Sequence, residues 1–437
     1  MWPYYPDLLE TPVPRYTSFP TAAEFTPAVG PNDADAALRA ARGDVSLYVH
    51  IPFCEKICWY CGCNTGAANR SQRLQSYLDA LHRDIAITGV RLDEGARVRR
   101  IAFGGGSPNA IAPTDFVRLV DALTLHMPLE TPSYSIELDP RTLTPEWGQV
   151  LGWIGVTYAS MGVQTFDPAL QAAIGRVQPD RLIAEATAML RQAGVSSLNF
   201  DLMYGLPGQG LAELEATLER AVALGADRIA LFGYAHVPHM LPRQRRIDAS
   251  ALPGQAARFE MAQFGYTMLC DAGYVPIGFD HFARPGDPMA VAAAEGRVRR
   301  NFQGFTDDPA ATLVGLGASA IGCFDDVLIQ NEKNAGRYRM MISQDVLPAV
   351  LGVRRSADDQ RRGAVIEALL CRSAAALDPD MLAEAAPRLA PFLARELVVL
   401  DGALLRITPD GLPYSRSIAA LFDPYRQDSL RRFSSAV

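Results

Sequence analysis

The sequence contains very few lysines. Of its 41 basic residues only Lys56 and Lys333 are lysines, and the rest are arginines. Because such a bias fits genome base composition, an isolated arginine says little about anion recognition. Acidic residues outnumber basic ones, and the formal net charge is -7. The composition therefore argues against nucleic acid or an anionic membrane as a partner, since both require a large basic surface.

Long apolar runs and export signals are also missing. No stretch of about 20 apolar residues occurs, so a membrane-spanning helix is not expected. The opening MWPYYPDLLETPVPRYTSFP lacks a basic start, an apolar core and a small-residue cleavage site. We therefore expect a cytoplasmic protein that binds small molecules or other proteins. The 437 residues, 49% of them hydrophobic, suffice for about two to three domains with a buried core.

Short β-rich runs alternate with longer amphipathic patterns in the first half of the chain, which predicts βα units around a parallel sheet. The expected strands are Ser46–Ile51, Arg100–Phe103, Ser133–Leu138, Thr157–Gly162, Ser197–Met203 and Arg228–Phe232. The expected helices include Gln72–Arg91, Thr114–His126, Arg181–Ala193 and Leu211–Ala223. Six such units fit a doubly wound sheet or a partial barrel. In both architectures ligands bind at the carboxyl ends of the strands.

The pattern changes in the second half of the chain. The alternation becomes irregular from about Pro242, and helical patterns follow after Asn331. The expected C-terminal elements are helices over Asp358–Leu370 and Pro379–Glu396, a strand pair over Val398–Asp401 and Ala403–Thr408, and a helix from Leu412. We expect an N-terminal extension over residues 1–40, an α/β unit over 41–340, and a smaller, largely helical domain over 341–437.

The seven cysteines are unevenly distributed. Four of them, Cys54, Cys58, Cys61 and Cys63, fall within ten residues directly after the first expected strand. The scattered ones, Cys270, Cys323 and Cys371, are expected to be small buried hydrophobic side chains. A secreted disulfide framework would spread its pairs along the chain.

The clustered cysteines favour an iron–sulfur cluster. Structural zinc sites usually join two separated pairs of ligands, and no second pair exists in this sequence. A thioredoxin-type motif would leave Cys54 and Cys63 unexplained. Three thiolates from one short loop can instead hold three irons of a cubane cluster and leave the fourth iron open to a substrate. Zinc or a fortuitous thiol cluster is the less favoured alternative.

Polar residues interrupt the apolar strands at similar positions. Glu137 ends the third expected strand, Gln164 follows the fourth, and Asp201 lies in the fifth. A single such residue is usually a satisfied core group or a cap, whereas three at corresponding strand ends argue for a common ligand. The run Gly104 to Gly106 after the second strand fits neither a P-loop nor a dinucleotide fingerprint. It serves as a tight turn or as backbone that approaches a ligand closely.

Motifs along nearly the whole chain resemble a known family. C-x3-C-x2-C after the first strand is similar to the signature of radical S-adenosylmethionine (SAM) enzymes. The ordered set of motifs resembles the oxygen-independent coproporphyrinogen III oxidases, also called dehydrogenases. These motifs are PRYTSFPTAAEF, SLYVHIPFC, GGGSP, IELDP, SMGVQTF, DLMYGLPGQ, YAHVP, DHFARP, RNFQGFT, GASAIG and RRFS. The resemblance implies a partial (β/α)6 TIM-like radical SAM barrel with a smaller, mainly helical C-terminal domain, and PRYTS as part of a lid.

The resemblance also implies cofactors and site residues. A 4Fe-4S cluster is expected on Cys54, Cys58 and Cys61, with Cys63 outside the ligand set. The implied contacts to a SAM on the cluster are Tyr48, Gly104, Glu137 and Ile321. The implied contacts to a second SAM are Tyr60, Gly105, Gly106, Gln164, Arg176, Asp201 and Ala235. The implied catalytic residues are Tyr48, Glu137, Phe302 and Gln303.

The implied activity is the oxidative decarboxylation of two propionates of coproporphyrinogen III to vinyl groups, which gives protoporphyrinogen IX. An electron donor such as flavodoxin or ferredoxin and a monomeric state are expected with it. The alternatives are a haem-binding chaperone of the same superfamily, or a radical SAM methyltransferase or cyclopropanase. Arginines are candidates to bind the propionates, although solvated charge explains them equally well. They are Arg243, Arg245, Arg246, Arg297, Arg299 and Arg300.

Overall fold

The computed structural model of the chain describes residues 1–68 and 71–426. Its main element is one twelve-stranded sheet with the order β16-β15-β14-β13-β1-β4-β5-β6-β7-β8-β10-β9. The RRFS motif near the C-terminus lies outside the described residues. No helix in the described part of the chain combines the length and the apolar character that a membrane crossing requires.

The centre of the sheet is parallel, and the six expected strands are confirmed with ends shifted by a few residues. They are β1 (Gly43–Ile51), β4 (Ala96–Gly105), β5 (Leu129–Leu138), β6 (Val156–Gln164), β7 (Ser197–Tyr204) and β8 (Arg228–Gly233). Neighbouring strands of this set pair in parallel. Leu47, Val49 and Ile51 of β1 are fully buried, as expected for a sheet covered on both faces.

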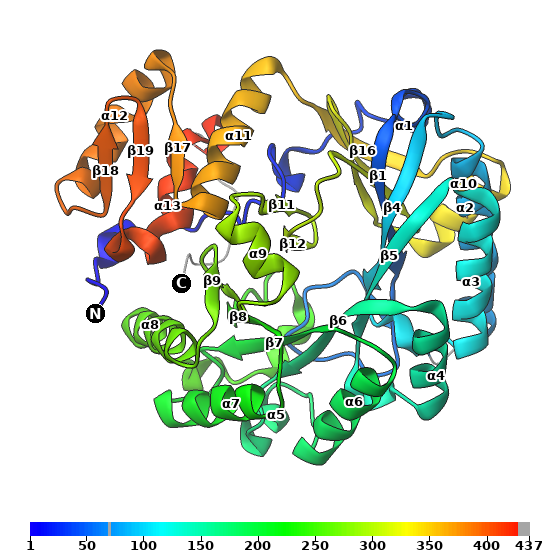
Figure 1. Cartoon of the computed structure of the whole chain (residues 1–437), viewed down its shortest axis with the longest axis horizontal. Helices are drawn as coiled ribbons and strands as arrows, with labels where there is room; N and C mark the ends of the chain where they lie inside the picture. The colour runs from blue at the N-terminus through cyan, green and yellow to red at the C-terminus, as the bar shows by residue number, and fades with distance from the viewer. Residues whose placement is uncertain (69–70, 427–437) are drawn as a thin grey trace.

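Helices line the outer side of this sheet. Figure 1 shows the sheet as an open arc with α2, α3, α4, α6, α7 and α8 along its convex side. Their bounds are α2 (Ser71–Gly89), α3 (Pro113–His126), α4 (Pro145–Ile154), α6 (Asp180–Gln192), α7 (Leu211–Ala223) and α8 (Gln255–Asp271). The short helices α5 (Pro168–Ala173) and α9 (Pro288–Ala294) lie in connections between strands. The arrangement confirms the expected α/β class with a partial rather than a closed barrel.

Four strands missed in the sequence extend the sheet beyond β1. They are β13 (Thr312–Leu316), β14 (Ile321–Cys323), β15 (Val327–Asn331) and β16 (Ala349–Arg354). β13 pairs in parallel with β1, and the next three strands continue in antiparallel order. The sheet therefore continues past residue 340, where we expected a domain boundary. These strands are short, and all but β15 contain a glycine, so they gave no clear period of two and were missed.

The opposite edge and the connections contain further short strands. β10 (His281–Ala283) pairs antiparallel with β8, and β9 (Val275–Ile277) pairs with β10. A small hairpin is formed by β11 (Arg299–Asn301) and β12 (Gly304–Thr306). Two short helices, α1 (Pro31–Ala40) and α10 (Ala335–Ser343), precede β1 and follow β15.

The C-terminal region after β16 combines helices with a small sheet. Its helices are α11 (Ala357–Arg372), α12 (Pro379–Leu393) and α13 (Ser415–Ala419), and its strands are β17 (Ala374–Ala376), β18 (Val398–Asp401) and β19 (Leu404–Ile407). The expected strand pair is confirmed as β18 and β19. The long helix expected from Leu412 is wrong, because a 3-10 turn over Pro409–Tyr414 that contains Pro413 precedes a short α13.

The scattered cysteines are less buried than expected. Cys270, Cys323 and Cys371 are each partly exposed. All three lie within one residue of the end of an element, namely α8, β14 and α11. Element ends lie nearer the molecular surface than element centres, so these thiols are half-buried and the expectation of core cysteines is wrong.

Candidate functional site

The cysteine loop leaves the carboxyl end of β1 and closes on itself. Its base is a two-strand ladder in which Phe53 of β2 (Phe53–Cys54) pairs with Gly66 of β3 (Gly66–Ala67). All the cysteines of the loop are free thiols, with Cys58 buried and Cys63 exposed. A loop closed at its base holds its sulfurs within a small volume. The structure thus places the expected ligands on the edge of the sheet where ligands bind.

Positive charge surrounds the most buried of these sulfurs. Arg176 Nη1 lies 3.1 Å from Cys58 Sγ, and Arg141 Nη2 lies 3.4 Å from the same atom. Both arginines also contact the carboxylate of Asp139, Arg141 at 2.5 Å and Arg176 at 3.4 Å. Cationic donors stabilise a thiolate, which is the form that binds metal. Asp139 and Arg141 were not predicted, since nothing in their local sequence indicates contact with the cysteine loop.

The other two expected ligands differ in acidity. Burial raises the pKa of Cys54 to about 11, although the Thr65 hydroxyl donates to its sulfur at 3.2 Å. Hydrogen bonds from Cys63 lower the pKa of Cys61 to about 6. Burial therefore disfavours the thiolate form of Cys54, whereas the hydrogen bonds from Cys63 favour that of Cys61, and metal binding requires both as thiolates.

The donor set fits an iron–sulfur cluster. It consists of three thiols on one closed loop, with guanidinium groups to offset thiolate charge. Within residues 1–68 and 71–426, no three His, Cys, Asp or Glu side chains are arranged so that they could bind a single metal ion. A cubane instead takes each thiolate on a separate iron, so its ligands do not converge on one point.

A cavity is lined by strands of the main sheet and by the β11–β12 hairpin, and we call it the central cavity. Its lining includes Glu137 and Asp201, together with Gln303 and His281. Asp201 accepts hydrogen bonds from Ser160 at 3.1 Å and Asn199 at 2.8 Å. The structure thus brings two of the three polar strand-end residues into one wall. Gln164, the third, is buried with a φ of 68° and does not belong to this lining.

The carboxylates of the central cavity resist ionisation. Burial raises the pKa of Glu137 to about 7, with repulsion from Asp201 acting in the same direction. Burial also raises the pKa of Asp201. The Oδ1 atom of Asn199 is buried without a hydrogen-bond partner in the described part of the chain. A polar ligand in this cavity would supply the missing donor, so this wall fits a polar cofactor.

The glycine run makes room for side chains that face the site. A Cβ on Gly104 would lie 2.7 Å from the carboxyl group of Glu137, and a Cβ on Gly105 would lie 2.6 Å from the ring of His50. The amide of Gly105 donates to Glu137 at 3.1 Å. The run therefore serves close packing at the site as well as the turn after β4.

The other residues expected to bind SAM or to take part in catalysis lie on several different elements. Tyr48 lies on β1 opposite Gly315, and Ile321 begins β14. The carbonyls of Tyr60 and Ala235 both accept hydrogen bonds from Gln244, at 2.9 and 3.0 Å. Phe302 lies in the turn between β11 and β12, where its ring packs against Phe25 with centroids 6.4 Å apart. The roles of these residues stay predictions.

Most of the arginines suggested for propionates do not gather at a site. Arg245, Arg246 and Arg297 are exposed, and Arg297 pairs with Glu295. Arg299 lies 3.6 Å from Glu367. Arg300 and Arg243 are the exceptions. Arg300 reaches the N-terminal segment and donates to the Arg15 carbonyl at 3.1 Å. Arg243 lies near enough to Cys61 for its charge to help lower the pKa of that thiol.

Comparisons with known proteins agree over nearly the whole chain. The Radical SAM superfamily profile matches residues 48–221. The oxygen-independent coproporphyrinogen III oxidase of Bradyrhizobium diazoefficiens is 40% identical over 98% of each chain. The protein of that name from Pseudomonas aeruginosa is 38% identical over 97% of this chain and 96% of its own. The structure of an Escherichia coli coproporphyrinogen III oxidase, described as a radical SAM enzyme, has a TM-score of 0.91 and 34% identity over 97% of this chain and 99% of its own.

Proposed function

The chain belongs to the oxygen-independent coproporphyrinogen III oxidases of the radical SAM superfamily, and on that premise we propose that it converts coproporphyrinogen III to protoporphyrinogen IX. Each of two propionate side chains loses one hydrogen atom, one electron and CO2, and becomes a vinyl group. The observation that carries the proposal is the full-length similarity, with a three-cysteine loop at the carboxyl edge of a matching fold.

The expected cofactors and the protein have different roles in this reaction. Cys54, Cys58 and Cys61 would hold a 4Fe-4S cluster. When bound, the cluster and SAM supply an electron and the 5'-deoxyadenosyl radical that removes hydrogen from the propionate. Two SAM molecules are part of the proposal, as are a flavodoxin or ferredoxin as electron donor, a monomeric protein and a cytoplasmic location.

The protein's own task is binding, orientation and exclusion of water. Arg176 and Arg141 donate to Cys58 Sγ at 3.1 and 3.4 Å and so position this sulfur in the cysteine loop. The aromatic rings of Phe232 and Phe305 in the wall of the central cavity limit access of water. Tyr48, Glu137, Phe302 and Gln303 are the residues that we propose to act closest to the reacting atoms.

The test is an anaerobic incubation of cluster-loaded protein with coproporphyrinogen III, SAM and a reductant. We expect protoporphyrinogen IX and 5'-deoxyadenosine with the wild type, and neither product with Cys58→Ser. Cys270→Ser, which changes a half-buried thiol outside the cysteine loop, is the matched control and keeps activity. Absence of both products from cluster-loaded wild type would reject the proposal, and haem binding without turnover would indicate a chaperone.

A further inference from the structure

A 3-10 turn over Pro242–Arg246 packs against the cysteine loop, and we call it the arginine turn. Its buried side chain, Gln244, holds it there through both ends of the amide group. Gln244 Nε2 donates to the carbonyls of Tyr60 and Ala235 at 2.9 and 3.0 Å, and its Oε1 accepts from the Val237 amide at 2.6 Å. Because these bonds use donor and acceptor together, they fix the turn on the loop.

Apolar contacts attach both ends of the arginine turn to the same loop. Ile247, directly after the turn, is buried in an apolar cluster against which Trp59 and Tyr60 of the loop pack. Leu241, directly before the turn, approaches Gly62 so closely that a Cβ there would lie 3.4 Å from Leu241 Cδ1. The turn therefore lies on the stretch of the loop that carries the second and third expected cluster ligands.

The arginine turn presents cations to solvent. Arg245 and Arg246 are exposed, and neither belongs to an ion pair among residues 1–68 and 71–426. Arg246 Cζ lies 6.0 Å from the centroid of the Trp59 ring. The exposed Arg83 and Arg354, by contrast, each pair with an aspartate. The charges of Arg245 and Arg246 are thus available to a partner.

The sequence has only two lysines, and both lie at the cysteine loop. Lys56 is an exposed residue of the loop itself. Lys333 is also exposed, and its carbonyl accepts from Asn64 Nδ2 of the loop at 3.1 Å. The acidic residues beside these cations are Glu55, Asp248 and Glu332. Cations therefore outnumber acids around the loop, in a protein whose formal net charge is -7.

Exposed apolar side chains accompany these cations. Met240, just before the arginine turn, is 61% exposed, and Val177 is 62% exposed. Val177 directly follows Arg176, whose guanidinium group contacts Cys58. A single exposed apolar side chain needs no explanation. Apolar side chains next to unpaired cations are typical of protein interfaces, which have an apolar centre and a polar rim.

This surface lies where an electron can reach the expected cluster. Trp59 is partly exposed beside the arginine turn and directly follows Cys58, the buried ligand. Electron transfer between proteins requires that the two redox centres come close together, so a donor must dock near the loop. Redox partners form small, transient complexes, and opposite charge accelerates their encounter. A positive surface at the loop fits a negatively charged donor.

We propose that the arginine turn, with Lys56 and Met240, is the docking surface for a small acidic electron-carrier protein. This inference rests on the proposed function, and it names the surface at which the electron for that reaction arrives. The reduced carrier loses one electron and the cluster gains it, and no bond forms or breaks at the surface.

Stopped-flow reduction of the cluster-loaded protein tests the surface, with a reduced acidic flavodoxin as the probe. The readout is the bleaching of the cluster's visible absorbance. We expect Arg245→Glu combined with Arg246→Glu to lower the second-order rate about tenfold, because the two proteins then repel each other. Photoreduced deazaflavin, a small reductant that needs no docking surface, should reduce wild type and variant at equal rates. Arg243 is left unchanged, because its charge lowers the pKa of Cys61.

The matched control is Arg39→Glu combined with Arg42→Glu, which changes the net charge by the same amount. The two side chains are 61% and 75% exposed. Both precede β1, whereas the cysteine loop follows it, so they lie away from the proposed surface. This variant should keep the wild-type rate with both reductants.

Ionic strength provides a measurement that needs no variant. An increase from about 0.01 to 0.15 M shortens the Debye length from about 30 to about 8 Å. The rate at which flavodoxin reduces wild type should fall over this range, and the rate for the Arg245 and Arg246 variant should not. Met240→Ser should lower the rate but keep the salt dependence of wild type, since methionine contributes apolar contact and no charge.

Several results would overturn the proposal. Flavodoxin could reduce the Arg245 and Arg246 variant at the wild-type rate, or fail to reduce wild type, or do so without salt dependence. An equal loss with deazaflavin would mean that the turn serves the cluster site and not docking. Turnover with deazaflavin tests the proposed function separately: wild type that is reduced but makes no protoporphyrinogen IX rejects the function, while the reduction rates still decide the docking surface.

Discussion

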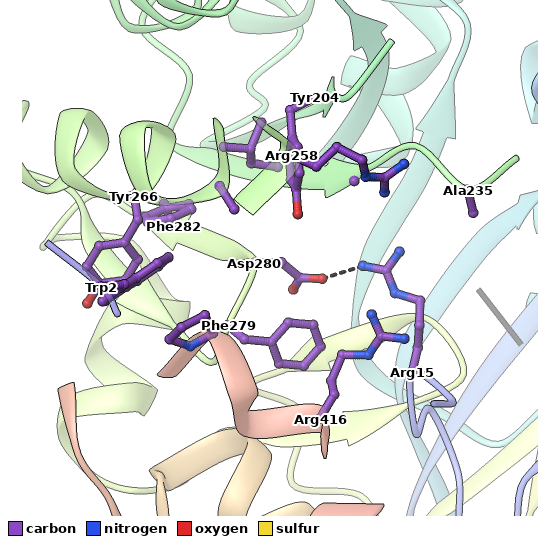
Figure 2. Close-up of a pocket in the computed structure, with 14 residues that line it drawn as sticks. Trp2, Arg15, Tyr204, Ala235, Arg258, Tyr266, Phe279, Asp280, Phe282 and Arg416 are labelled. Atoms are coloured by element: carbon purple, nitrogen blue, oxygen red, sulfur yellow. Dashed lines mark hydrogen bonds and ion pairs between the residues drawn. The ribbon is translucent and has the colours of Figure 1, made fainter. Parts of the chain in front are cut away.

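The central cavity lies beside a smaller cavity lined by Arg15, Arg258, Arg416 and Asp280, which we call the arginine pocket (Figure 2), and arginines are used differently in the two. In the central cavity each arginine has an aspartate partner: Arg100 lies 2.7 Å from Asp307, and Arg228 lies 3.2 Å from Asp287. In the arginine pocket Arg15 contacts Asp280, and Arg258 and Arg416 donate to the main-chain carbonyls of Tyr234 and Pro14. The difference teaches that the number of arginines does not mark an anion site, because buried guanidinium groups also serve to join distant segments of the chain.

The two regions also differ in how their walls are built. The central cavity is lined mainly from successive strands of one sheet and from the β11–β12 hairpin. The arginine pocket needs both ends of the chain, because Arg15 precedes β1 and Arg416 lies in α13. Figure 1 shows the N-terminus beside the C-terminal region. The arginine pocket therefore forms only when the ends dock on the sheet.

The largest expected effect on stability comes from breaking the ion pair between Asp287 and Arg228, which lines the central cavity. Asp287 is almost fully buried, lies 3.2 Å from Arg228, and caps α9 through the Met289 amide at 2.8 Å. Asp287→Asn leaves a buried cation without its counter-charge, and we expect a loss of about 3 to 5 kcal/mol in the free energy of unfolding. Urea denaturation checks this value. Asp326→Asn is the control: its pair with Arg354 is exposed, so its effect should stay below about 1 kcal/mol.

The next effect is a pH dependence located in the central cavity. The pKa of Glu137 rises from 4.5 to about 7 on folding because of burial. The folded state thus binds this proton more tightly, so its contribution is full below pH 4.5 and is lost as the pH rises through 7. We expect Glu137→Gln to gain stability relative to wild type between pH 5 and pH 8, by at most about 3 kcal/mol. Denaturation curves that shift in parallel with pH would contradict this prediction.

The smallest expected effect concerns the docking of the N-terminal segment. Tyr16 donates a buried hydrogen bond of 2.9 Å to Asp423 in the C-terminal region. Tyr16→Phe removes this hydrogen-bond donor and should lower the free energy of unfolding by about 1 kcal/mol. We expect faster proteolysis of the N-terminal segment while the strands of the main sheet remain protected. Unchanged proteolysis would show that other contacts hold this segment.

Much of the fold could be predicted from local patterns. The six parallel strands and α2, α3, α6 and α7 appear within a few residues of their expected positions, because apolar periodicity is a local property. β13 to β16 were missed because all four are short and all but β15 contain a glycine, so their runs resemble loops. The domain boundary expected at residue 340 falls between β15 and β16 of the same sheet.

The residues of the candidate site could also be predicted only in part. The cysteine loop and the strand-end residues Glu137 and Asp201 could be found from sequence, since each follows or ends a strand. Asp139 and Arg141 could not, because their contact with the cysteine loop depends on how two connections meet above the sheet. Arg258 looks like any other helix arginine until α8 is packed against the end of β8.

The sequence by itself determined the βα order, the thiol loop and the family, because hydrophobic period, strand ends and motif spacing are properties of neighbouring residues. Only the tertiary structure decided which charges are neutralised and which converge. Electrostatic interactions act through space, and Arg15, Arg258 and Arg416 come together only after the sheet, α8 and both chain ends have packed. The arginine pocket is therefore a property of the fold, whereas the cysteine loop is already visible in the chain.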